Sequence, residues 1–459
     1  LPFGEIGNIA LPYQTYEAVY TQGLLDKFER DGTQLIDSTA LVSEGGFIEM
    51  DDHWWRTSGS MKFDPNQFYL PTVQLDPFGH EYLMAYDNYQ LALVSTSTEI
   101  YGKIILSQAE LDYRTLAPTL MTDPNRNQQQ VIFDELGMVV CTAIIGKNGE
   151  GDRLDNYQIQ SISPIDLRDD IYQNQLQYLQ GATSFFYYDL ESWSRDRIPN
   201  HTVGVVRETH VSDENGIPSK TQIAFSYFDG LGQPIMIKVQ AEPGDAFRID
   251  SSGTVANDPA DPRWVGNGRI VYNNKGNPVK QYEPYFSHNY DYETEDELVK
   301  YGVTPILHYD TLGRNIKTDL PDGTFTKVEF TPWEQITNDQ NDTVLESQWY
   351  IDRGSPDPNG AEPNVIGNPS NYPTRAAWLA AQHADTPKVE HLDTLGRVFL
   401  MVDDNVDDGL VKTHFVLDII GNQTAVIDAK DRLITRNHFN MSQEVIKTES
   451  MDAGRRWSL

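Results

Sequence analysis

The 459-residue sequence contains one cysteine and few basic residues. A single cysteine excludes a disulfide within the chain, and the apolar neighbours of Cys141, from Val139 to Ile145, predict a buried and unreactive thiol. No apolar run approaches the roughly 20 residues of a membrane-spanning helix, so we expect no direct membrane insertion. Lys and Arg number 35 against 68 Asp and Glu, a formal charge of -33, which excludes nucleic acid as a partner.

Signatures of catalytic and metal sites are also missing. His80-Glu81-Tyr82-Leu83-Met84 has Met84 where a zinc protease motif requires a second histidine. There is no Gly-x-Ser-x-Gly elbow, and Gly146-Lys147-Asn148 and Gly266-Asn267-Gly268 lack the context of nucleotide-binding loops. The acidic run from Asp403 to Gly409 departs from calcium-loop spacing, and we interpret it as a solvated turn. We therefore expect no catalytic residue, no metal ligand and no cofactor.

Turn-forming and aromatic residues are abundant. The chain has 33 Gly, 25 Pro and 24 Tyr, a composition typical of many short strands joined by turns, and 39% hydrophobic residues are enough for a sizeable core. The first residues, Leu1-Pro2-Phe3-Gly4, contain neither an initiator methionine nor a signal peptide. We interpret the sequence as a piece of a longer protein.

Residues 309 to 333 contain the clearest unit of organisation. Tyr309 ends a predicted strand, and Asp310 begins a turn in which its carboxylate accepts backbone N–H groups while Gly313 provides a positive φ. After Arg314 the chain runs out to a second turn at 321 to 323 and returns as a strand. The unit is therefore a β-hairpin without reactive chemistry.

Weaker copies of this unit recur along the chain. The residues that we expect to set the turns and fill the layer beneath them are Tyr309, Asp310, Gly313, Arg314, Asp393, Gly396, Arg397, Phe228, Asp229, Gly232, Phe133, Asp134, Gly137, Asp76 and Gly79. Further turns are expected at Tyr86-Asp87, Asp123, Asn273, Asp418, Asp428 and Asn440. Steps of ten to eleven residues between turns equal one strand plus one turn, which predicts successive arms of a long antiparallel sheet.

Individual segments give more local predictions. Residues 234 to 240 alternate, with Ile235, Ile237 and Val239 on the predicted apolar face, and 398 to 402 is apolar on both faces and should be covered on both. Apolar spacing predicts helices over 15–32, 166–180, 294–301 and 374–383, and proline and asparagine predict an exposed loop over 354–373. For Trp54 and Trp55, burial against the first strands is favoured over sugar stacking.

The tandem unit Tyr-Asp-x-x-Gly-Arg, followed by a strand and Asp-Gly, resembles the RHS or YD repeat of bacterial toxins, effector proteins and animal teneurins. Over residues 10 to 459 the sequence is similar to the middle and C-terminal part of the B component of Tc toxin complexes. The segments that carry this second resemblance include 68–71 with 76–79, 207–213, 240–244, 263–266, 272–276, 282–284, 330–333 and 341–343.

The resemblance implies an all-β fold: a long antiparallel sheet curling into part of a hollow shell, with a few short helical insertions. It implies a secreted toxin complex, closure with a C component or C-terminal RHS segment, an enclosed toxin polypeptide and an A-component channel reached through a propeller that this sequence lacks. Residues 1–75 would form a lead-in and 76–459 the shell, with insertions at about 150–205 and 335–385. We hypothesise that the acidic charge partly lines the interior.

Two other functions remain open. A YD-repeat shell can serve as a surface adhesion or glycan-binding module that presents loops such as 354–373 to a receptor. A carbohydrate-active enzyme using the aromatic cluster at 53–55 is the second alternative. The resemblance favours a non-catalytic shell over both.

Overall fold

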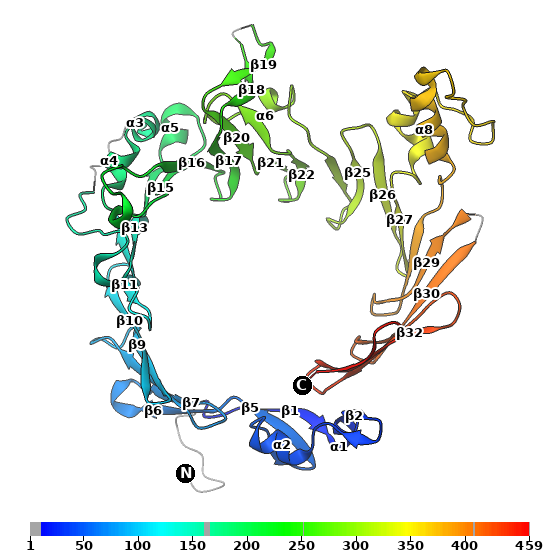
Figure 1. Ribbon diagram of the computed structural model, residues 1–459. Coiled ribbons are helices and arrows are strands. Elements are labelled where there is room, and N and C mark those ends of the chain that lie inside the picture. The colour runs from blue at the N-terminus through cyan, green and yellow to red at the C-terminus, as the bar shows by residue number, and fades with distance from the viewer. Residues whose placement is uncertain (1–10, 160–165, 251, 407–408, 459) are drawn as a thin grey trace. The chain divides into compact units, whose positions relative to one another are not determined.

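The computed structural model describes residues 11–159, 166–250, 252–406 and 409–458. The chain divides into two compact units. The first unit comprises residues up to 16 together with 57–269 and 283–302, and the second comprises 17–56, 270–282 and the residues from 303 onward. Both units are built mainly of antiparallel strands, as the sequence predicted (Figure 1).

The first unit contains, within its described residues, a 16-stranded sheet. Its order is β19-β18-β23-β20-β17, followed by β16 to β6 in unbroken reverse chain order, so most neighbours are joined by hairpins. The strands are β6 (Ser60–Asp64), β7 (Leu70–Leu75), β8 (Glu81–Tyr86), β9 (Leu93–Ile100), β10 (Lys103–Asp112), β11 (Ala117–Thr122), β12 (Gln128–Phe133), β13 (Val139–Ile145), β14 (Ser184–Asp189), β15 (His201–Arg207), β16 (Thr221–Phe228), β17 (Pro234–Ala241), β18 (Gly244–Ile249), β19 (Val255–Ala260), β20 (Arg263–Asn267) and β23 (Tyr285–Ser287).

The second unit contains, in the part that the structure describes, a 13-stranded sheet in which β21, β22 and β24 to β34 follow one another in chain order. The strands are β21 (Ile270–Tyr272), β22 (Pro278–Gln281), β24 (Ile306–Tyr309), β25 (Asn315–Asp319), β26 (Phe325–Phe330), β27 (Glu334–Asn338), β28 (Lys388–Leu392), β29 (Val398–Asp404), β30 (Leu410–Leu417), β31 (Gln423–Ile427), β32 (Leu433–Phe439), β33 (Val445–Ser450) and β34 (Gly454–Trp457).

The remaining elements are short. Two small sheets consist of β1 (Tyr16–Thr21), β5 (His53–Thr57) and β4 (Ile48–Met50), and of β2 (Glu29–Arg30) and β3 (Thr33–Gln34). The helices are α1 (Gln22–Leu25), α2 (Ser38–Ser43), α3 (Arg168–Gln173), α4 (Gln175–Leu179), α5 (Ser192–Asp196), α6 (Glu295–Leu298), α7 (Gln348–Ile351) and α8 (Tyr372–Ala381). None of the helices in the described ranges is long and apolar enough to cross a membrane.

Large parts of both sheets are a single layer. From Ser60 to Phe133, a range described throughout, Asp87 is the only buried residue. From Val303 to Asn341, Thr324 is likewise the only buried residue. Side chains on a strand alternate between the two faces, so this pattern means that neither face of these strands is covered by a second layer of protein.

A core forms where helices cover the sheet. In the first unit, α3 and α4 place Ile171 and Leu179 against β13 to β17, and Cys141 at the centre of this core is fully buried, as predicted (Figure 1). Burial raises the pKa of the Cys141 thiol to about 12, which makes it unreactive. In the second unit, Trp54 packs with Val19 and with Ile446 of β33.

The helix predicted over 15–32 is wrong over most of its length. Residues 16–21 form β1, and α1 covers only four residues, with the Thr21 hydroxyl accepting the Leu24 N–H at its start. Pairing of β1 with β5 places Val19 and Tyr20 in the core, so tertiary pairing overrides the helical spacing. The helices predicted over 166–180, 294–301 and 374–383 are present as α3 with α4, α6 and α8.

Two predictions about covered faces are wrong. In β17 the buried residues are Met236 and Lys238, whereas Val239 on the predicted core face is 40% exposed. The Lys238 ammonium is buried because the Glu293 carboxylate lies 2.5 Å away and offsets its charge. In β29, predicted to be covered on both faces, Phe399 is 41% exposed. The sheet has one layer there, and the Phe399 ring is covered only in part, by neighbours on the adjacent strand such as His391.

Within the described ranges the strands form two large sheets, together with the two small ones, rather than one continuous ribbon. The first sheet begins at Ser60, and β14 and β15 belong to it, although the sequence placed them in an insertion. Residues 339–387, between β27 and β28, lie outside the sheet and contain α7 and α8. The boundary at residue 75 stays a prediction.

Candidate functional site

The turn that begins at Asp310 gathers its polar contacts on one carboxylate. Asp310 Oδ1 accepts the backbone N–H groups of Leu312 and Arg314, both at 2.9 Å, and Oδ2 accepts Arg314 Nε at 2.8 Å. The Gly313 N–H donates to the Asp310 carbonyl, and Gly313 has a φ of 84°. A residue with a Cβ is strained at that φ. A turn of this kind, which we call a corner, therefore favours an acceptor side chain at its first position and glycine at its fourth.

The same corner recurs at the other predicted turns. Asp393 accepts the N–H groups of Leu395 and Arg397 at 2.9 Å, and Gly396 has a φ of 76°. One side-chain oxygen accepts the N–H groups two and four residues later at Asp76, Asp134, Asp229, Asn273, Asp418, Asp428 and Asn440. Asp250, which the sequence analysis did not predict as a turn, makes the same two contacts. The glycines in fourth position, with φ between 76° and 104°, are Gly79, Gly137, Gly232, Gly253, Gly276, Gly396 and Gly421.

Four corners use a residue other than glycine in the left-handed position. Gln90, Arg126, Asp431 and Gln443 have φ values of 59°, 70°, 56° and 65°. Sequence reasoning assigned the positive φ to glycine and missed these residues. The sequence signal that could have identified these residues is the Asp or Asn three positions earlier, which follows the preceding turn by the expected ten to eleven residues.

The aromatic residue before a corner lies at a β-bulge. The strand register shifts between His308 and Tyr309, and the same shift occurs at Phe133 and Phe228. The Tyr309 hydroxyl donates to the Pro278 carbonyl at 2.7 Å, and Tyr86 donates to the Pro71 carbonyl at 2.9 Å. Each tyrosine thus connects its corner to the neighbouring strand, whereas phenylalanine supplies only apolar contact.

Basic side chains connect one corner to the next along the sheet edge. Arg397 Nη1 donates to the carbonyls of Asp418 and Ile419, at 3.4 Å and 3.2 Å. Lys275 Nζ donates to the Thr311 carbonyl at 3.1 Å. Arg314 instead lies over the Phe330 ring, 4.2 Å from its centroid. Every second hairpin turn lies at the same edge, so these contacts form a ladder of corners within the second unit.

The corners stabilise the ionised form of their aspartates. The Arg314 backbone N–H and guanidinium lower the pKa of Asp310, and Arg397 lowers the pKa of Asp393 in the same way. Charged acceptors bind N–H donors more strongly than neutral ones. The predicted site residues therefore make many small structural sites, distributed over two units, and do not converge on a cleft.

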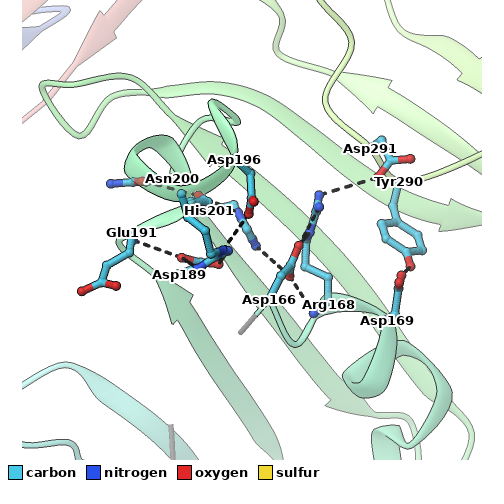
Figure 2. A network of polar contacts seen from close by, with 12 residues as sticks. Asp166, Arg168, Asp169, Asp189, Glu191, Asp196, Asn200, His201, Tyr290 and Asp291 are labelled. Atoms are coloured by element: carbon cyan, nitrogen blue, oxygen red, sulfur yellow. Dashed lines mark hydrogen bonds and ion pairs between the residues drawn. The ribbon is translucent and has the colours of Figure 1, made fainter. Parts of the chain in front are cut away.

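A separate polar network lies in the first unit between the sheet and α3 and α5 (Figure 2). Asp189 ends β14 and is the direct cross-strand partner of His201, the first residue of β15. Arg195 Nη2 lies 2.6 Å from Asp189 Oδ2, and Arg168 Nη2 lies 2.7 Å from Asp166 Oδ2. The sequence analysis did not find this network, because its members are separated along the chain and match no motif.

The electrostatics of the network favour a neutral imidazole between charged groups. Burial and the nearby Arg168 guanidinium lower the pKa of His201. Burial alone would raise the pKa of Asp166, but its hydrogen bonds with Arg168 outweigh burial and hold it below the ordinary value. Asp166, Asp189 and His201 each present a ligand atom, and these atoms lie within 4.8 Å of one another.

The network does not resemble a working hydrolase site. Ser192 Oγ lies 3.3 Å from His201 Nδ1, and Asp166 lies on the other side of the imidazole, an order reminiscent of a catalytic triad. Ser192 is only 1% exposed, and its hydroxyl donates to the Pro199 carbonyl. A substrate carbonyl cannot reach this serine in the described structure.

The other residues that the sequence suggested for a metal or sugar site either make structural contacts or lie outside the described residues. His80 Nδ1 lies 2.8 Å from Asp76 Oδ2, which makes it part of a corner rather than a zinc motif. Trp54 is buried, so the two tryptophans do not form a paired sugar platform. Asp407 and Asp408 of the acidic run lie outside the described residues.

Solved structures match the fold over nearly the whole chain. The crystal structure of TcdB2-TccC3 matches with a TM-score of 0.77 and 23% identity, covering 97% of this chain and 21% of that one. TcdB2-TccC3 without the hypervariable C-terminal region gives 0.76 and 21%, again over 97% of this chain and 23% of that one. The Tc holotoxin pore of Photorhabdus luminescens, carrying a TccC3 variant, gives 0.75 and 20%, with the same coverages of 97% and 23%.

No family model and no curated protein matches the sequence. The chain spans less than a quarter of the length of the solved chains that it matches. The likeness in fold nevertheless extends over 97% of its residues. The chain therefore has the fold of one stretch of these Tc toxin structures.

Proposed function

We propose that this chain forms part of the wall of a hollow RHS-repeat shell that encloses a toxin polypeptide in a secreted Tc-type complex. The observation that carries the proposal is the match of 97% of the chain to TcdB2-TccC3. In this role the chain has no catalysis of its own. The resemblance in sequence and the likeness in fold support the same class of protein by separate routes.

The layering of the sheets supports a wall rather than a globular enzyme. Strands β6 to β12 leave both faces without a covering layer, as shown by the burial of Asp87 alone between Ser60 and Phe133. A globular domain buries at least one face of each sheet to form its core. A sheet with two accessible faces is suited to separating an interior from an exterior.

The partners follow from the same proposal. A C component, or a C-terminal RHS segment of the same protein, completes the shell, and the toxin polypeptide occupies its interior. An A-component channel receives the toxin from the complete assembly. The similar structures include a TcdB2-TccC3 complex and a Tc holotoxin pore, which supports this set of partners.

The experiment is protection of a guest from protease. The complete protein that contains this chain is co-expressed with a C component carrying a tagged C-terminal guest, and the purified complex is treated with trypsin. We expect the tag to resist cleavage until urea opens the shell, while the same guest expressed alone is cut at once. Cleavage of the tag at the rate of the free guest, or no complex between the two proteins, would contradict the proposal.

A further inference from the structure

Three side chains that the proposed function does not use converge beside strand β15. Asp189 and His201 are cross-strand partners on β14 and β15, and Asp166 reaches them from the segment before α3 (Figure 2). His201 Nε2 lies 3.8 Å from Asp166 Oδ1, and the ligand atoms of all three residues lie within 4.8 Å. Two carboxylates and an imidazole thus lie close together, and the sheet positions Asp189 and His201.

The imidazole has an unpartnered nitrogen directed at this point. Among the described residues, no group lies within hydrogen-bonding distance of His201 Nε2, and the side chain is fully buried. The other ring nitrogen, Nδ1, lies 3.3 Å from Ser192 Oγ and 3.4 Å from the Pro199 carbonyl. A buried polar atom without a partner carries an unfavourable desolvation cost. A bound ion would remove that cost.

The two arginines orient the carboxylates, and Asp189 Oδ1 also accepts the Glu191 backbone N–H at 3.0 Å and Arg195 Nη1 at 3.5 Å. Arg168 occupies Asp166 Oδ2 through Nε and Nη2, and Arg195 Nη2 lies 2.6 Å from Asp189 Oδ2. Asp166 Oδ1 accepts the Arg168 backbone N–H and also faces His201. Outer partners of this kind orient ligands at metal centres.

The local charge also fits a divalent cation. Arg195 pairs with Asp189 and with Asp196, and Arg168 pairs with Asp166 and lies 3.6 Å from Asp291. Four carboxylates therefore face two guanidinium groups, and two negative charges remain while His201 is neutral. A dication would balance them.

We propose that Asp166, Asp189 and His201 bind one divalent transition-metal ion, with zinc as the expected ion. One nitrogen and two oxygen ligands suit zinc, whereas calcium and magnesium take oxygen ligands alone. Two ligands of a tetrahedral zinc lie roughly 3.3 Å apart, so binding draws ligand atoms that lie within 4.8 Å of one another together by up to about 1.5 Å. Asp166 is partly exposed, and its contacts with Arg168 would shift with it in this movement.

The ion would have a structural role at this site. A cavity of about 340 Å³ adjoins the network at Asp189 and Arg195. Binding would fasten Asp166, two residues before α3, to strands β14 and β15, because the ligands come from both places. The inference does not depend on the proposed enclosing function.

Zinc binding to the tag-free protein, first treated with a chelator, tests this inference. Titration with zinc chloride should show one equivalent bound and a rise in melting temperature, which zinc-free buffer does not give. Asp166→Asn and His201→Gln should each weaken binding at least tenfold. The matched control is His288→Gln, since His288 pairs with Asp258 at 2.6 Å in the same unit and the described residues supply no third ligand there, so this variant should bind zinc as the parent does.

Spectroscopy of the parent protein keeps the test independent of whether the variants fold. X-ray absorption of the zinc-loaded protein should report nitrogen and oxygen ligands and no sulfur, and cobalt substitution should give an absorption band of low-symmetry coordination. A sulfur ligand would point to Cys141 and overturn the assignment. Absence of stoichiometric zinc binding, or equal binding by Asp166→Asn and His288→Gln, would overturn it as well.

Discussion

Lys238 and Glu293 form an ion pair inside the first unit, with Nζ and Oε2 2.5 Å apart. The Lys238 side chain is fully buried on β17, and Glu293 comes from the segment before α6. The same ammonium donates to Ser287 Oγ, and the Tyr285 hydroxyl donates to the same carboxylate. Burial lowers the pKa of Lys238, and the Glu293 charge acts against that shift. The pair is what allows this face of β17 to be covered.

Removing one partner should be far more costly than removing both. Glu293→Gln leaves a buried ammonium without a counter-charge, and we expect the free energy of unfolding to fall by about 3 to 5 kcal/mol. The double variant Lys238→Met with Glu293→Gln should recover a large part of that loss, because no buried charge remains. Urea denaturation of the parent, both single variants and the double variant measures the cycle. Additive losses would show that the pair does not act as a unit.

Acid should weaken the corners through their aspartates. The pKa of Asp310 in the folded protein lies below its ordinary value of 3.8, chiefly because of the Arg314 backbone N–H, so its stabilisation is complete above pH 3.8 and is lost as the pH falls through the lowered pKa. Asn serves in the same corner at Asn273 and Asn440. Asp310→Asn should therefore melt below the parent at neutral pH, and the difference should disappear in strong acid. A constant difference at every pH would contradict the charge contribution.

A side chain at Gly313 should destabilise its corner. Gly313→Val places a β-branched residue at a φ of 84°, and we expect a loss of about 2 kcal/mol. Gly230 is the matched control, because it lies in the Asp229 corner without a positive φ and with open space around its Cα. Gly230→Ala should leave the melting temperature unchanged or slightly raised. Equal effects of the two substitutions would remove the backbone explanation.

Glycine should stabilise a corner that lacks it. Asp431 is exposed and has a φ of 56°, so Asp431→Gly relieves left-handed strain and should raise the free energy of unfolding by up to about 1 kcal/mol. Lys430, one residue earlier and also exposed, has no positive φ. Lys430→Gly should lower stability by about 0.5 to 1 kcal/mol, because it only adds flexibility to the unfolded chain. Thermal melts of both variants measure the opposite signs.

We expect the packing of Ile446 to stabilise β1 and β5, which lie in the N-terminal part of the second unit. Ile446 on β33 is 1% exposed and contacts the cluster of Val19 and Trp54, while the Trp457 indole N–H donates to the Lys27 carbonyl at 2.9 Å. Ile446→Ala should cost about 2 to 5 kcal/mol and increase amide exchange in β1 and β5.

Val445 provides the control for this substitution. It is the neighbour of Ile446 on the same strand and is 39% exposed, so Val445→Ala should change exchange in β1 and β5 very little. Equal exchange in both variants would mean that β33 does not support these strands. Hydrogen exchange followed by mass spectrometry resolves the two segments.

The corners were readable from the sequence because every interaction that defines them is local. The carboxylate of Asp310 bonds to groups two and four residues away, and the residue three positions on takes a positive φ. Where glycine fills that position, as at Gly396, residue type and spacing reveal the turn. Where Asp431 fills it, the geometry is the same but the sequence signal is weaker, and the left-handed residue was missed.

The sequence alone therefore determined the β-class of this protein, the places where its chain reverses and the absence of a recognisable catalytic motif. Only the tertiary structure decided that Lys238 and not Val239 faces the interior, that residues 16–21 pair as a strand, and that Asp166, Asp189 and His201 meet. Turns depend on contacts between atoms a few residues apart, so the types and spacing of those residues predict them. Burial and convergence depend on which distant segment covers a given face, and no short stretch of sequence carries that information.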